Sequence, residues 1–217
     1  MITEAANEPS GAHTTLGHPL PWYRVWFLAL TRPRVATFSE LAGQPGAKAS
    51  RAFLWVFLAG CFDFLGATFV QVILVPIFYP GNSAFEGTFL GRSVLWVCAF
   101  PLYGVLFLLG FMLMAALMQW LARALGGSGT FDQLAFVLGA LAAPFSIITA
   151  VLLPFVAIPY VGLCFGLLTL VLSIYILGLQ VPAIMGVNRL GWDKASIALI
   201  LPGIVVGLPA LVILFAL

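Results

Sequence analysis

The chain has 217 residues, of which 63% are apolar or aromatic and only 7% carry a formal charge. Soluble globular domains are about 45–50% apolar and about 25% charged, so this composition excludes a water-soluble enzyme, a disordered chain and a nucleic-acid-binding domain. The formal net charge of +2 is too small to indicate a polyanionic partner, and we predict an integral membrane protein.

Residues 1–21 form a polar stretch that contains both histidines, His13 and His18. A cleaved signal peptide would have a basic start followed by an apolar stretch, but no Lys or Arg precedes Arg24. We therefore expect a disordered tail that stays on the side of the membrane where it is made.

Residues 22–51 are intermediate in character, and we expect a cytoplasmic interfacial segment. Residue types of the lipid headgroup region gather at its start, at Trp22, Tyr23, Arg24 and Trp26. Apolar residues then recur at helical spacing, at Val35, Phe38 and Leu41, and Pro33 suits the first turn of a helix. We predict one or two short amphipathic helices over 22–47 that lie on the cytoplasmic leaflet, with a docking surface for a protein partner as the competing use.

The remaining residues, 52–217, contain apolar stretches of membrane-spanning length. A helix that crosses a hydrocarbon core of about 30 Å needs about 20 mostly apolar residues. Residues 133–188 carry no charge and are too long for one helix, and the prolines of PFVAIPY at 154–160 supply a turn. We predict an all-α bundle of five transmembrane helices, over about 52–78, 93–122, 133–153, 160–185 and 195–217.

Several short patterns indicate where these helices begin and end. Gly126 or Gly127 suits the left-handed conformation that follows a helix. Thr130 and Gln133 have the spacing of a capping box at the start of the third span. Asp193 is expected to cap the fifth span, a structural use of this carboxylate.

The basic residues indicate the orientation. With five spans, the N-terminal region and the loops at 123–132 and 186–194 share one side of the membrane. That side holds eight of the nine basic residues, namely Arg24, Arg32, Arg34, Lys48, Arg51, Arg123, Arg189 and Lys194. Because cytoplasmic loops carry the excess of Lys and Arg, we predict a cytoplasmic N-terminus and an external C-terminus in a bacterial cytoplasmic membrane.

Asp63 is the one charged residue placed inside a predicted span. A carboxylate at the bilayer centre costs about 2.5–3.5 kcal/mol, so it should be protonated, paired or facing water. Gln71 lies eight residues further on, broadly on the same helical side. Two interpretations stay open: an ion, proton or partner site, and a carboxyl group that is hydrogen-bonded inside the bundle.

Prolines and glycines recur within the spans. Each span holds a proline that shapes the bundle or marks a broken-helix transport site, namely Pro76, Pro101, Pro144, Pro182 and Pro202. Two pairs with GxxxG spacing, Gly162 with Gly166 and Gly203 with Gly207, suit close helix packing. That packing is either between the fourth and fifth spans or between two copies in a homo-oligomer.

Catalytic and metal-binding patterns are absent from the sequence. The three cysteines, Cys61, Cys98 and Cys164, fall in apolar runs at no metal-ligand spacing, and no histidine lies in a span. No thiol has a base nearby and no carboxylates pair on a helix face. We therefore predict neither an enzyme nor a metal or cofactor site.

Three segments together resemble the Yip family, the Ypt/Rab-interacting five-span membrane proteins, in its bacterial form. They are LALTRPRVATFSEL at 28–41, GGSGTFDQLAFVLGALAAP at 126–144 and GVNRLGWDKASIALILPG at 186–203. The resemblance covers roughly 28–217 and implies a non-enzymatic membrane protein. Eukaryotic relatives are associated with small GTPases and vesicle traffic, but their aspartate-leucine-tyrosine-glycine-proline motif has no counterpart here, so GTPase binding is not carried over.

Two functional hypotheses follow. The first is a membrane protein that acts through lipid, membrane-protein or cytoplasmic-protein partners, using its cytoplasmic loops and the 22–47 segment as the contact surface. The alternative is a small transporter or channel subunit that uses Asp63 and Gln71.

Overall fold

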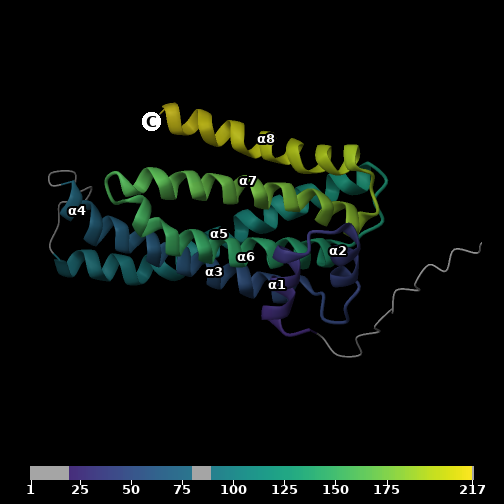
Figure 1. Cartoon of the computed structure of the whole chain (residues 1–217), viewed down its shortest axis with the longest axis horizontal. Helices are drawn as coiled ribbons and strands as arrows, with labels where there is room; N and C mark the ends of the chain where they lie inside the picture. Colours follow the sequence, from purple (N-terminus) through teal and green to yellow (C-terminus); the bar gives the residue numbers. More distant parts are fainter. Residues whose placement is uncertain (1–19, 80–88, 217) are drawn as a thin grey trace, which may run out of the picture.

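In the computed structural model, the backbone is described for residues 20–79 and 89–216, and the side chains for residues 20–79 and 99–205. This part of the chain is all helical and contains no strand (Figure 1). Its elements are α1 (Trp22–Thr31), α2 (Val35–Ala42), α3 (Ala49–Phe69), the π-helix η1 (Val70–Leu74), α4 (Val75–Phe78), α5 (Phe89–Ala124), α6 (Phe131–Val156), α7 (Val161–Asn188) and α8 (Trp192–Ala216).

Four helices of the described chain are long and apolar enough to cross a membrane. They are Ala49–Phe78, Ala99–Ala124, Phe131–Val156 and Val161–Asn188. They correspond to the first four predicted spans. The fifth, 195–217, falls on α8, and because much of that helix lies beyond the described side chains, its crossing stays a prediction.

The first long helix changes its geometry near its end. The α-helix α3 passes into the π-helix η1 and then into α4, which contains Pro76. Proline has no N–H and its ring clashes with the carbonyl four residues earlier. The wider turns of η1 accommodate this clash, so the helix continues to Phe78.

The centre of the bundle is α6. In its most apolar stretch 56% of the residues are buried, against 6–11% in the other three candidate spans. It packs in parallel against α3, where glycines bring the backbones together. A Cβ on Gly139 would lie 2.7 Å from the Cβ of Ala52, and one on Gly66 would lie 2.9 Å from the carbonyl oxygen of Ala150.

The predicted helix ends are mostly confirmed. Thr130 and Gln133 form the capping box, and Gly126 has a φ of 96° after α5. The helix α6 continues through Pro154 to Val156, so only residues 157–160 of the predicted PFVAIPY turn lie between α6 and α7. The predicted N-cap role of Asp193 is wrong, because the Ala195 N–H bonds to Gly191 O, so α8 starts at Trp192 and Asp193 falls in its first turn.

The segment before the bundle forms two helices that pack against it. Val25 and Ala29 of α1 and Phe38 of α2 are fully buried in the core, so the apolar faces are directed toward the protein. Pro33 lies in the connection between α1 and α2, outside the first helical turn predicted for it, because α2 begins at Val35.

The ends of the bundle differ in composition. Figure 1 shows α1 and α2 at the same end as the α5–α6 and α7–α8 connections, whereas the α6–α7 turn lies at the opposite end. We call the first of these the basic end, because its elements carry the eight basic residues that the sequence assigns to one side.

Candidate functional site

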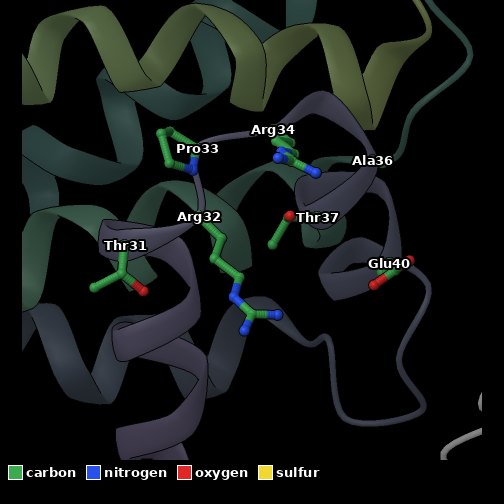
Figure 2. A pocket seen from close by; sticks show the side chains of 7 residues that line it. All are labelled: Thr31, Arg32, Pro33, Arg34, Ala36, Thr37 and Glu40. Carbon is green, nitrogen blue, oxygen red and sulfur yellow. The ribbon is translucent and has the colours of Figure 1, made fainter.

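The basic end has a surface hollow at the bend between α1 and α2. This elbow hollow has a volume of about 530 Å³. Figure 2 shows the side chains that line it. It is lined by Thr31, Arg32, Pro33, Arg34, Ala36, Thr37 and Glu40. In Figure 2 the Thr37 hydroxyl lies between the guanidinium groups of Arg32 and Arg34, with the Glu40 carboxylate to one side.

The polar groups of the elbow hollow are largely unused by the protein. Arg32 and Arg34 are exposed, and neither pairs with a carboxylate within the described chain. Arg34 precedes α2 in an extended conformation, and no side chain caps that helix. The Thr31 hydroxyl is the exception, because it donates to Phe27 O at 2.6 Å. The elbow hollow therefore offers more donors than its own residues satisfy.

The elbow is held in place by contacts with α7. The Tyr175 hydroxyl donates to Leu30 O at 2.7 Å. Gly186 of α7 lies so close to α2 that an added Cβ would approach the carbonyl oxygen of Val35 to 2.6 Å. Together with the burial of Phe38, these contacts fix the direction in which α2 leaves the bend.

The predicted interfacial residues divide between two environments. Trp22 and Tyr23 are more than half exposed, and Arg24 is exposed as well. Trp26 is partly buried against the core, and its ring lies 5.9 Å from that of Trp55 with the planes nearly perpendicular. Thus α1 presents an aromatic and basic outer face while Trp26 attaches it to α3.

A buried pair of amide side chains, which the sequence analysis did not predict, also lies at the basic end. Gln119 of α5 donates through Nε2 to Gly129 O at 2.6 Å and to Asn188 Oδ1 at 3.1 Å. Their side chains are 3% and 1% exposed. Ser128 N–H also bonds to Asn188 O at 3.2 Å. The pair joins the α5–α6 loop to the end of α7. The sequence feature that could have predicted it is the presence of amide side chains near the ends of two apolar helices.

The glycine-rich loop is shaped by this contact. A Cβ on Gly129 would lie 2.7 Å from Asn188 Oδ1, and one on Gly127 would lie 2.9 Å from Asn188 Cβ. Lys194 reaches the same region and donates to Leu125 O at 3.0 Å. The glycines of GGSGT therefore allow the loop backbone to lie close to Asn188.

The carboxylate of Asp63, which belongs to a candidate span, has a hydrogen-bonding partner that the sequence analysis did not predict. Asp63 lies at the midpoint of the Ala49–Phe78 helix and is half-buried. Its Oδ2 accepts a hydrogen bond from the Tyr103 hydroxyl of α5 at 3.2 Å. Gln71 is exposed on η1, and the described structure contains no hydrogen bond from its side chain. The structure therefore joins Asp63 to Tyr103 and does not join it to Gln71.

The Asp63–Tyr103 pair lies beside a close crossing of α3 and α5. A Cβ on Gly60 would lie 2.8 Å from the Cβ of Phe107, and one on Gly104 would lie 2.5 Å from the Cys61 sulfur. The Tyr103 ring also lies 5.2 Å from that of Phe64. The hydroxyl reaches the carboxylate because small residues bring these two helices together.

The glycines predicted to pack helices differ in what lies next to them within the described chain. Gly162 lies in the α6–α7 turn region, against the carbonyl of Val156. A Cβ on Gly166 or Gly203 would meet nothing within 4 Å, and Gly207 lies outside the described side chains. A contact of these glycines with a second copy stays a prediction.

The titratable residues of the described chain form no cluster of three or more His, Cys, Asp or Glu that could hold a metal. Cys61 is buried and Cys164 is exposed, while Cys98 lies outside the described side chains.

Comparison with known proteins adds one finding. The family model described as the Yip1 domain matches residues 27–214, which is most of the chain and includes the elbow, the amide pair and all four candidate spans. Neither the curated proteins nor the solved structures include a match to the chain.

Proposed function

The chain belongs to the Yip family, and from this premise we propose a non-enzymatic membrane protein that acts through protein or lipid partners at its basic end. The role is a membrane-organising or adaptor role, similar to that of a trafficking factor. The family match and the apolar helices support a multi-pass membrane protein. We propose that such a protein contacts lipid along the bundle and other molecules at its ends.

The observation that carries this proposal is the position of α1 and α2. Their apolar faces are buried against the bundle, whereas Arg24, Arg32 and Arg34 remain exposed without carboxylate partners within the described residues. Exposed basic and aromatic residues on a fixed element are typical of a contact surface, because little conformational entropy is lost when it binds.

We also propose a membrane topology for the whole chain. The bundle has five spans with α8 as the fifth, the N-terminus is cytoplasmic, and the C-terminus is external in a bacterial cytoplasmic membrane. The distribution of Lys and Arg supports this orientation.

A photocrosslinking experiment tests the adaptor role. A photoreactive residue replaces Phe27, which is 65% exposed on α1, and a matched control replaces Leu170, which is 55% exposed on the candidate span α7. We expect reproducible protein adducts from position 27 in intact cells, together with lipid adducts from position 170. Position 27 yielding no protein adduct above that of position 170 would contradict a protein-partner role.

The second candidate function is a small transporter or channel subunit, and the Asp63–Tyr103 pair favours it. Both residues belong to candidate spans, and Tyr103 is still 36% exposed, so the pair is not sealed inside the bundle. An intramembrane carboxylate at mid-span is typical of ion and proton pathways.

Asp63→Asn and Tyr103→Phe separate this function from a packing role. A transport role predicts that Asp63→Asn abolishes proton- or ion-dependent flux into proteoliposomes while the protein remains folded. A packing role predicts no flux above empty vesicles for the native chain and a lower melting temperature for both variants, because each loses the 3.2 Å hydrogen bond.

A further inference from the structure

The elbow hollow combines several donors around one space. Arg32 and Arg34 both line it, and the one carboxylate that lines it is Glu40. Guanidinium groups present planar, paired donors that match the oxygens of phosphate, and they remain charged at all physiological pH values. The balance of charge around the elbow hollow therefore favours an anion.

The backbone adds donors at the same place. The first-turn N–H groups of a helix lack hydrogen-bond acceptors within that helix. In α2 no capping side chain supplies such an acceptor. Two residues of that first turn, Ala36 and Thr37, line the elbow hollow. The Thr37 hydroxyl is a further donor, and it lies between the two guanidinium groups in Figure 2.

The elbow hollow is preformed. Tyr175 bonds to the end of α1 and Gly186 contacts the start of α2, so both arms of the bend are attached to α7. Pro33 restricts the connection between them. A ligand that binds here does not have to order the segment first.

The aromatic residues of α1 and the basic residues of the basic end indicate the level of the membrane at which the elbow hollow lies. The exposed Trp22 and Tyr23 belong to α1, one arm of the bend, and these residue types concentrate at the headgroup level. The elements of the basic end carry eight of the nine basic residues. An anion in the elbow hollow would therefore lie among lipid headgroups or in the adjoining aqueous layer.

We propose that the elbow hollow is a binding site for a phosphate group, held by Arg32, Arg34 and the first turn of α2. The phosphate belongs to an anionic lipid headgroup or to a soluble phosphate compound. This inference deepens the proposed function, since it names a chemical partner for the basic end.

The test measures binding of phosphatidic acid to the purified full chain in a neutral detergent, by native mass spectrometry. Diacylglycerol with the same acyl chains serves as the ligand control because it lacks the phosphate. The native chain is expected to retain phosphatidic acid in preference to diacylglycerol. Inorganic phosphate is then added as a competitor: displacement identifies a soluble source, and retention of the lipid identifies a headgroup source.

Four variants locate the site. Arg32→Gln and Arg34→Gln should each weaken binding on the order of tenfold, because each removes a charge-assisted contact. Glu40→Gln should strengthen binding, because it removes the opposing carboxylate. Arg189→Gln is the matched control: it removes the same charge from an exposed residue that follows α7 at the basic end, outside the elbow hollow, and should bind like the native chain.

Two results would overturn the proposal. One is equal binding by the native chain, Arg32→Gln and Arg34→Gln, and the other is an equal loss in Arg189→Gln, which would indicate only general attraction of charges. Because Arg32 and Arg34 are exposed, circular dichroism should show native helix content for all variants. Either result would leave the photocrosslinking outcome at position 27 unaffected, so this site and the adaptor role fail separately.

Discussion

At the scale of residues, Gln119 and Asn188 show how two amides join distant helix ends inside an apolar protein. Gln119 Nε2 serves two acceptors, Gly129 O and Asn188 Oδ1, and both side chains are almost fully buried. A buried polar group that loses its partner keeps the cost of desolvation. The pair therefore stabilises the basic end only while both amide side chains are present.

Gln119→Leu is expected to lower the free energy of unfolding by about 1–3 kcal/mol, because it removes both hydrogen bonds that Gln119 donates and leaves the buried Asn188 Oδ1 without a donor. Thermal melting in detergent measures the change. The matched control is Gln180→Leu, since Gln180 is a half-buried amide with no hydrogen bond among the described residues. An equal decrease in both variants would argue against a specific role of the pair.

At the scale of elements, contact between helices depends on individual glycines. Gly139 brings α6 against Ala52 of α3, and Gly186 brings α7 against α2. By contrast, Gly166 on α7 faces open space within the chain. The GxxxG spacing pointed to Gly166 and not to Gly139 or Gly186. Spacing alone does not indicate which face of a helix meets a neighbour.

Gly139→Ala should destabilise the bundle by about 1–3 kcal/mol, because its Cβ would lie 2.7 Å from that of Ala52. Gly166→Ala is the matched control and should be neutral or stabilising by about 0.5–1 kcal/mol, as alanine favours the helix. Melting temperatures in detergent compare the two. If Gly166→Ala were the more damaging substitution and also shifted the oligomeric state, a contact between copies would be indicated.

At the scale of the whole molecule, the long helices separate a basic end from an opposite end. The connections after α5 and α7 lie together with α1 and α2, and the α6–α7 turn lies at the far end (Figure 1). The excess of Lys and Arg at the basic end predicts that this end faces the cytoplasm. The number of crossings then decides where the C-terminus lies.

The topology is tested with a reporter that is active only in the cytoplasm. Fused at the C-terminus it should be inactive, and inserted at Gly191 between α7 and α8 it should be active, since five spans place these points on opposite sides. Activity at both points would mean that α8 does not cross, which would leave four crossings.

The sequence by itself determined the class of protein, the four candidate spans, the capping box at Thr130 and the bias of basic residues. These depend on composition and on residues close together in the chain. Only the tertiary structure decided that Asp63 meets Tyr103 rather than lying with Gln71, that Gln119 meets Asn188, and that Arg32, Arg34 and Thr37 surround one space. The physical reason is that lipid is as apolar as a protein core. Core-facing and lipid-facing sides of a span then have similar composition, so the pattern along the chain carries little information about which helices touch.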